Sequence, residues 1–375
     1  MSRDACGSLD RSFTHHEITH HEITSHGSCV SEIGGAWRDE RRFRIDPILV
    51  SNSTSTPTAS DVNALVERVR EHPNVQDKLT INRAYEEPVG RTVPFDHPLV
   101  PDVNEEVRIG DDCAALPTGT DYLLFAAEGI LPAFVKEYPW FAGYSAVMVN
   151  LSDICAMGGR PLALTDMLWI DDQADGEEVW AGMQAAAEDY GVPVVGGHTS
   201  YRCGPKHLGV AVLGQARQLL TSYDAAAGET LVMAVDLDGE YFEEYPFWNA
   251  SVDDSPERLQ SLLPLMQGAA EEGWSQAAKD ISMGGIAGTL AMLLHTSDVG
   301  AELRLDDVPK PPSVGWEKWL VSFPSFGYLM TTTADDVAAI QRHFHAHDIA
   351  CAAVGEIQAE VGLRITHDGA TAALF

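Results

Sequence analysis

The sequence predicts a two-domain protein of the α/β or α+β class, built on a mixed sheet. Its 375 residues exceed the usual length of one domain, which favours two domains with some additional sequence. Segments with strand and helix patterns alternate without a regular one-to-one order, as expected for a sheet of mixed direction. The pattern restarts after residues 218–228. We therefore expect domains at 59–220 and 221–375, preceded by a disordered tail at 1–58.

The tail is rich in His, Ser and Thr and lacks apolar periodicity, which is typical of disordered segments. Residues 16–20 read HEITH and so match a zinc-binding pattern in which two histidines lie one helical turn apart. A tandem repeat of HEIT accounts for this string, and its β-branched residues disfavour a helix. We expect adventitious metal binding at most, and no metalloprotease activity.

The first domain begins with a helix at 61–70, where Val62, Leu65, Val66 and Val69 recur at helical spacing. Strands are predicted at 106–109 and 122–127, followed by a long apolar helix at 140–157 that ends at a glycine pair. A strand at 162–169, a helix at 177–190 and strands at 192–195 and 208–213 complete this half.

The second domain begins with a strand at 230–235 and a helix at 256–272. A further helix at 286–294 follows directly from an acidic turn. The remaining segments predict a strand pair within 320–331, broken at Pro324, then a helix at 335–347 and strands at 350–357 and 362–366.

The charge balance restricts the class of partner. The 24 basic and 56 acidic residues give a net charge of −32, which repels nucleic acid and anionic membrane surfaces. With so few cationic side chains, an anionic substrate would need a metal ion as a bridge. The six cysteines are scattered, without a Cys-x-x-Cys pair, and no run of about 18 apolar residues occurs. We expect a cytoplasmic protein with no nucleic-acid or membrane partner.

Four short turns share one composition: a carboxylate or imidazole beside glycine or another small residue, at the edge of an apolar segment. They read IGDDCAAL at 109–116, LSDICAMGG at 151–159, GGHTS at 196–200 and KDISMGG at 279–285. Each turn alone is weak evidence, because Asp and Gly are the commonest turn residues. Together they place several carboxylates and glycines where a ligand can approach the backbone closely.

The chemistry of these turns favours magnesium and a nucleotide. Mg²⁺ prefers carboxylates, water and phosphate oxygens, and Asp111, Asp112, Asp153 and Asp280 supply the carboxylates. A metal between these groups and ATP turns their repulsion into attraction and neutralises charge during phosphoryl transfer. The glycine pairs would allow backbone N–H groups to reach the phosphates.

The ordered strings GDDCAAL, NLSDICAMGGRP and DISMGG resemble the AIR synthase-like, or PurM-like, superfamily. This group includes aminoimidazole ribonucleotide synthetase, thiamine-monophosphate kinase and selenophosphate synthetase. The resemblance extends from about residue 60 to the C-terminus. It implies a PurM-like fold, and a homodimer whose N-terminal sheets pair into a barrel. It also implies Mg²⁺-dependent use of ATP to phosphorylate or activate an oxygen of a small-molecule metabolite.

The resemblance also implies roles for individual residues. Asp112, Asp153 and Asp280 match its metal ligands, and His198 and Asp280 are the catalytic candidates. Glu128 falls where relatives usually carry Asp. The positions that match its nucleotide site are Asp111, Glu128, Asn150, Gly196, Gly197 and His198. A histidine in a Gly-Gly turn could equally cap backbone groups.

The member of the family stays open. GGHTS is similar to the selenophosphate synthetase turn, but Cys29 is not followed by that enzyme's lysine. Met283 replaces the second carboxylate of the DISDG string of thiamine-monophosphate kinases. A nucleotide-binding protein without turnover is the alternative. Cys113 and Cys155 occupy small-residue positions and are expected to pack, not to react.

Overall fold

The computed structural model describes residues 59–80, 92–96, 104–171, 173–201, 204 and 206–375. The predicted tail, its HEITH string and Cys29 lie outside these ranges. The described chain contains helices and both parallel and antiparallel strands, so the mixed α+β class predicted from the sequence is confirmed. Among the described residues, no helix is long and apolar enough to cross a membrane.

The first half is built on a five-stranded sheet in the order β3-β4-β7-β5-β6. Neighbouring strands in this sheet are antiparallel, except for β5 and β6, which are parallel. The strands are β3 (Ala114–Pro117), β4 (Tyr122–Ile130), β5 (Arg160–Ile170), β6 (Val194–Tyr201) and β7 (His207–Ala216). The strands β1 (Thr92–Asp96) and β2 (Asn104–Arg108) form a separate antiparallel pair.

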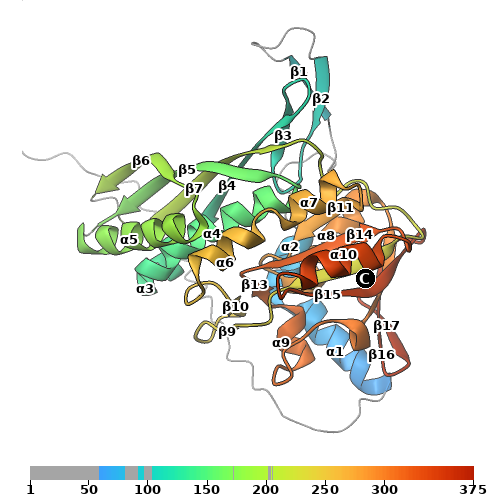
Figure 1. Cartoon of the computed structure of the whole chain (residues 1–375). Coiled ribbons are helices and arrows are strands. Elements are labelled where there is room, and N and C mark those ends of the chain that lie inside the picture. The colour runs from blue at the N-terminus through green and yellow to red at the C-terminus, as the bar shows by residue number, and fades with distance from the viewer. Residues whose placement is uncertain (1–58, 81–91, 97–103, 172, 202–203, 205) are drawn as a thin grey trace, which may run out of the picture. The chain divides into compact units, whose positions relative to one another are not determined.

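Helices cover one face of this sheet. They are α3 (Pro132–Glu137), α4 (Pro139–Ala156) and α5 (Gln173–Tyr190), and Figure 1 shows all three on the same side. Along β5, Leu164, Leu168 and Ile170 are buried beneath the helices, whereas Met167 and Trp169 are exposed on the opposite face. The alternation follows from the two-residue period of a strand.

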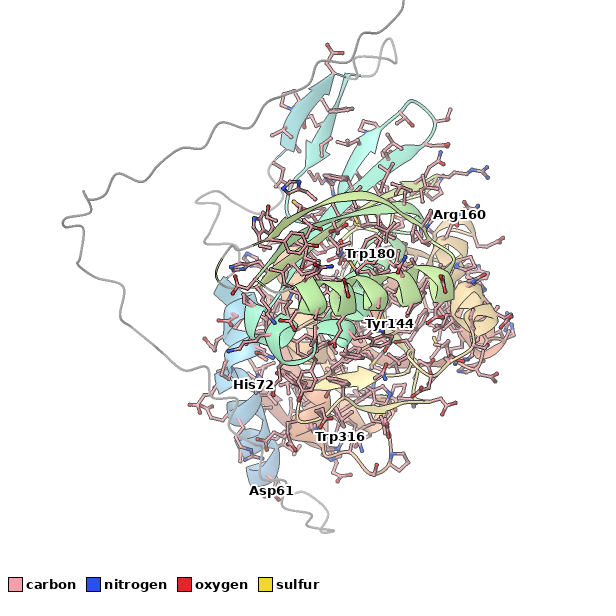
Figure 2. All side chains as sticks on the ribbon, turned by 90° about the vertical axis from the view of Figure 1, so that its left-hand side faces the viewer. Asp61, His72, Tyr144, Arg160, Trp180 and Trp316 are labelled. Carbon is pink, nitrogen blue, oxygen red and sulfur yellow. The ribbon has the colours of Figure 1, made fainter. Side chains whose placement is uncertain are left out.

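Helix α4 is apolar on nearly all sides because it is covered on nearly all sides. Tyr144 of α4 is buried, whereas Trp180 of the neighbouring α5 is 39% exposed; both are labelled in Figure 2. Two glycines allow the helices to approach closely. A Cβ built at Gly143 would lie 2.0 Å from the carbonyl oxygen of Val179, and one built at Gly182 would lie 1.8 Å from that of Trp140.

The second half is built on a seven-stranded sheet in the order β11-β14-β8-β15-β12-β16-β17. Its strands are β8 (Thr230–Val235), β11 (Ser275–Asp280), β12 (Gly300–Arg304), β14 (Gly327–Thr332), β15 (Ala350–Gln358), β16 (Gly362–His367) and β17 (Ala370–Ala373). The short strands β9 (Glu240–Tyr241), β10 (Phe247–Asn249) and β13 (Phe323–Pro324) form a third small sheet.

Both faces of the seven-stranded sheet are covered. Leu231 and Met233 of β8 pack in the cluster that contains α8 (Gly285–Ser297), whereas Val232 and Ala234 pack in the cluster that contains α7 (Leu265–Glu271) and α10 (Val337–His345). A strand buried on both faces reads as a continuous apolar run, as β8 does. This is why the sequence predicted its bounds without error.

The first two helices of the described chain pack against the second half. Val62, Val66 and Val69 of α1 (Ala59–Glu71) join the core beside α8. Arg70 donates from Nε to the carbonyl oxygen of Leu374 and from Nη2 to that of Ala373, at 2.6 Å each. Helix α2 (Pro73–Thr80) continues along α8.

Several predicted elements differ from those observed. The helix predicted at 256–272 is two helices, α6 (Pro256–Leu262) and α7, because Pro264 precedes the first turn of α7 and cannot donate a helical hydrogen bond. Leu320 ends a short helix, α9 (Trp316–Leu320), instead of beginning a strand. The turn predicted at 196–200 is part of β6, because it pairs with β5 along its whole length.

The contact between α4 and α5 yields a stability prediction. We expect Gly143→Ala and Gly182→Ala each to lower the free energy of unfolding by about 1–3 kcal/mol, because the added methyl groups must push the helices apart. Urea denaturation would measure the change. Gly129→Ala is the control, since a Cβ there meets nothing within 4 Å. Unchanged stability in Gly182→Ala would contradict this packing.

Candidate metal and nucleotide site

Three buried carboxylates from distant segments meet at one point. Asp112 lies in the loop between β2 and β3, Asp153 lies in the last turn of α4, and Asp280 is the last residue of β11. One carboxylate oxygen from each lies within 4.8 Å of the others. The structure therefore brings together the three residues that the sequence predicted as metal ligands.

Local structure fixes each of the three. Asp153 is held by the rigid, fully packed α4, which also contacts β11. Asp280 precedes a turn in which Gly284 and Gly285 have φ of 105° and 64°, a conformation that other residues rarely adopt. That turn directs the chain from β11 into the N-terminus of α8.

Asp111 fastens the loop that carries Asp112. Its Oδ1 accepts from the backbone N–H of Asp112 at 3.0 Å, and its Oδ2 accepts from the N–H of Ser222 at 2.9 Å. Ser222 lies just before β8, so Asp111 ties the acidic loop of the first half to the start of the second. Its carboxylate therefore positions the loop.

The cluster disfavours the ionised state of its own members. Burial, followed by the charges of Asp280 and Asp112, raises the pKa of Asp153 well above its usual range. Burial and Asp112 raise the pKa of Asp280 to about 7. Burial, again with Asp112, raises the pKa of Asp111 to about 6. Carboxylates in this situation gain stability from a bound cation.

One ammonium group lies inside the cluster. Lys279 of β11 is 3% exposed, and its Nζ pairs with Oδ1 of Asp112. Burial alone would lower the pKa of Lys279, but the charges of Asp112, Asp111 and Asp280 raise it. A single ammonium does not balance this number of carboxylates. Lys279 was not among the residues predicted for this site, although the sequence places it between two apolar alanines and the acidic turn.

Several buried oxygens around the cluster have no hydrogen-bond donor. Among the described residues, Oδ2 of Asp112, Oδ2 of Asp153 and Oδ1 of Asn150 are buried and unpaired. Asn150 lies one turn before Asp153 on α4, and its Nδ2 donates to the carbonyl oxygen of Ala146 at 2.7 Å. Leaving buried acceptors unpaired is costly. Hard oxygen ligands without donors fit a divalent cation such as Mg²⁺.

The glycine and histidine of the third motif lie elsewhere. In β6, Gly197 is opposite Asp166 of β5, and a Cβ on it would lie 1.8 Å from Oδ1 of Asp166. His198 therefore points to the other, exposed face of the sheet, where its Nε2 contacts Oγ of Ser200 at 3.1 Å. Among the described residues, His198 is not part of the carboxylate cluster.

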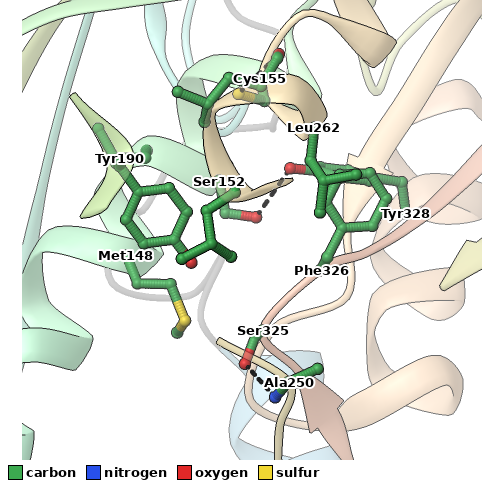
Figure 3. Close-up of a pocket in the computed structure, with 12 residues that line it drawn as sticks. Met148, Ser152, Cys155, Tyr190, Ala250, Leu262, Ser325, Phe326 and Tyr328 are labelled. Carbon is green, nitrogen blue, oxygen red and sulfur yellow. Dashed lines mark hydrogen bonds between the residues drawn. The ribbon is translucent and has the colours of Figure 1, made fainter. Parts of the chain in front are cut away.

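A small cavity lies beside α4, between Ser152 and Cys155 on one side and Tyr328 on the other (Figure 3). Its volume is about 20 Å³, which is room for one or two waters. Ser152 Oγ donates to the Tyr328 hydroxyl at 3.3 Å. Burial raises the pKa of the Cys155 thiol to about 12, which fits the packing role predicted for it.

Comparisons with known proteins agree with this architecture. Family models match residues 110–216 (AIR synthase related protein, N-terminal domain) and 220–368 (AIR synthase related protein, C-terminal domain). An uncharacterized protein of Synechocystis is 44% identical over 255 residues, 68% of this chain and 79% of that protein. The thiamine-monophosphate kinase of Rhodopirellula baltica is 29% identical over 170 residues, 44% of this chain and 50% of that enzyme.

Among solved structures, Thermotoga maritima PurL complexed with ATP superposes with a TM-score of 0.61 at 18% identity, a likeness of fold. The match covers 84% of this chain and 54% of PurL, so the chain spans about half the length of that protein. The resemblance inferred from the acidic turns is thereby confirmed, and the chain belongs to the AIR synthase related proteins of the PurM-like superfamily.

Proposed function

We propose that this protein is a Mg²⁺-dependent, ATP-using enzyme that phosphorylates or activates an oxygen of a small-molecule metabolite. The observation that carries the proposal is the buried cluster of Asp112, Asp153 and Asp280, whose unpaired oxygens fit a hard cation. The relatives support the choice of nucleotide, since one is a thiamine-monophosphate kinase and another is PurL complexed with ATP.

In this proposal the three aspartates hold the metal. When bound, Mg²⁺ supplies the charge that neutralises the phosphates and the transferred group. Asp111 keeps the acidic loop in place, and Lys279 keeps one oxygen of Asp112 occupied. Asn150, one turn from Asp153, offers an unpaired oxygen to the metal or to the nucleotide.

Two further residues approach the site from outside the cluster. Glu128 of β4 feels the charges of Asp112 and Lys279, and its pKa is raised mainly by burial. Gly285 begins α8, and a helix N-terminus of this kind favours binding of phosphate. Gly196, Gly197 and His198 stay predicted nucleotide contacts, but their position in β6 gives them no part in the metal site.

We also propose a homodimer that forms through the uncovered face of the five-stranded sheet. Phe125 and Leu213 are cross-strand partners on that face and are 51% and 39% exposed. Met167 and Trp169 extend the apolar surface along β5, and exposed apolar surface of this kind marks interaction sites. The strongly acidic composition supports a protein without nucleic-acid or membrane partners, and the scattered cysteines support a cytoplasmic location.

A second candidate is nucleotide binding without turnover. Met283, which is 41% exposed in the turn after Asp280, supplies no carboxylate where the DISDG string has one. Release of phosphate from ATP in the presence of a panel of small hydroxyl and carboxylate acceptors separates the two candidates. Turnover with any of these acceptors rules out the binding-only function.

Asp153→Asn tests the metal role directly. We expect this variant to lose Mg·ATP binding in calorimetry without a fall in its unfolding midpoint, because Asn is isosteric but uncharged. Asp335→Asn is the control, since Asp335 is exposed and follows the end of β14 that is remote from Asp280. Nucleotide affinity equal to that of the wild type would contradict the assignment.

The raised pKa of Asp280 predicts a dependence of stability on pH. Because the folded-state pKa of about 7 exceeds the ordinary 3.8, the folded protein binds the proton more tightly, and stability falls as the pH rises through this window. We expect metal-free Asp280→Asn to gain stability relative to the wild type by up to about 1.4 kcal/mol per pH unit in the same window.

Urea denaturation in EDTA at pH 5 to 8 measures this difference. Addition of Mg²⁺ at pH 8 should stabilise the wild type and leave Asp280→Asn nearly unchanged, since a ligand that binds only the folded state raises the free energy of unfolding. A wild-type-to-variant difference that does not vary with pH would refute the electrostatic account of the cluster.

The proposed dimer is tested by Phe125→Asp and Leu213→Asp. We expect each variant to sediment as a monomer at concentrations where the wild type is a dimer, because a charge would be buried in an apolar interface. Trp180→Asp is the matched control, being similarly exposed but located on α5, on the opposite side of the sheet. Dissociation of all three variants alike would locate the interface elsewhere.

A further inference from the structure

Helix α2 carries a lysine to the edge of the carboxylate cluster. The helix lies at 73–80, before the first residue that either family model matches. The stem of Lys78 rests on the turn between β11 and α8. A Cβ built at Gly284 would lie 2.8 Å from Cγ of Lys78, and one built at Gly288 would lie 3.5 Å from it. Glycine at these positions is what allows the lysine to lie so close.

The positive charge of Lys78 lowers the pKa of two acidic residues at the cluster. Burial raises the pKa of Glu128 and of Asp280, and Lys78 acts in the opposite direction on both. The ammonium group therefore lies on the side of the site where β4 of the first half faces the acidic turn of the second. Glu128 and Asp280 belong to different halves, so Lys78 lies near the junction between them.

Lys78 has no ionic partner in the described part of the chain. Lys279 pairs with Asp112 and Lys206 pairs with Asp175, whereas no hydrogen bond or salt bridge involves Nζ of Lys78. It is half-buried at the end of its helix. In a chain with a net charge of −32, an ammonium group at an acidic site with no fixed partner is free to contact an anion that enters with a metal.

The position of this lysine is fixed by more than α2 alone. Val75 of α2 is fully buried, and the preceding α1 is fastened to the end of the chain through Arg70. The two helices thus form an anchored segment in front of the family domains. We propose that Lys78 is a phosphate-contacting residue of the site, supplied by this segment; the inference rests on the proposed function.

A purely structural role for Lys78 makes a different prediction. If its four methylene groups only fill the space between α2 and α8, then Lys78→Met, which keeps an apolar stem without the charge, should behave like the wild type. Lys78→Arg keeps the charge and can still bind phosphate. Lys136→Met on α3 serves as the control for removal of an exposed positive charge.

The experiment uses the full chain and measures the dissociation constants of Mg·ATP, magnesium tripolyphosphate and Mn²⁺ alone. We expect Lys78→Met to weaken the binding of Mg·ATP and of magnesium tripolyphosphate by about 10- to 100-fold, which is the usual effect of losing a hydrogen bond to a charged group. Lys78→Arg should stay near the wild type, and Mn²⁺ should bind no more weakly to any variant. Thermal unfolding verifies that the variants are folded.

The outcomes distinguish failure of the role assigned to Lys78 from failure of the proposed function. If the wild type binds Mg·ATP and Lys78→Met binds it equally well, the role of Lys78 is refuted and the proposed function stands. If the wild type binds tripolyphosphate but not ATP, and Lys78→Met no longer binds tripolyphosphate, the role of Lys78 stands and the proposed use of ATP is wrong. If the wild type binds neither, both fail.

Discussion

The mutual repulsion of Asp112, Asp153 and Asp280 is the constraint on which the rest of the structure depends. Burying three carboxylates within 4.8 Å of one another is unfavourable, and such an arrangement persists only where the surroundings determine it. Here a packed helix, the end of a strand and a loop tied at Ser222 each hold one of them. Lys279 offsets part of the charge, and in the proposed function the remaining negative charge favours binding of a cation.

The sequence predicted elements whose pattern is local and missed those that depend on distant partners. Helix α4 and strand β8 are long apolar runs with clear ends, so their positions were recognised. Strand β11 reads SQAAKD, with little intrinsic preference for a strand, and forms because β14 pairs with it. Gly196 and Gly197 suggested a turn, but pairing with β5 extends them.

The candidate site could likewise be predicted only in part: its aspartates were named, but its lysines were not. The composition of the acidic turns suggested four aspartates as ligands, and the family resemblance selected Asp112, Asp153 and Asp280 among them. The roles of the lysines were not predicted, because they depend on distant parts of the chain. Lys279 pairs with Asp112, 167 positions away, and the charge of Lys78 acts on Glu128 because α1 and α2 pack against the second half. His198 was predicted either to contact the nucleotide or to cap backbone groups, and its place in β6 directs it to the exposed face of the sheet.

The two hydrogen bonds from Arg70 to the carbonyl oxygens of Ala373 and Leu374 have a consequence for the site. These hydrogen bonds hold α1 in place. Helix α1 contacts α2, which packs against α8 next to the acidic turn. Loss of the Arg70 guanidinium would release α1 from Ala373 and Leu374. Ala373 and Leu374 thus support the position of α1 and α2 next to the proposed cation site, although they lie far from Asp112 and Asp153 in sequence.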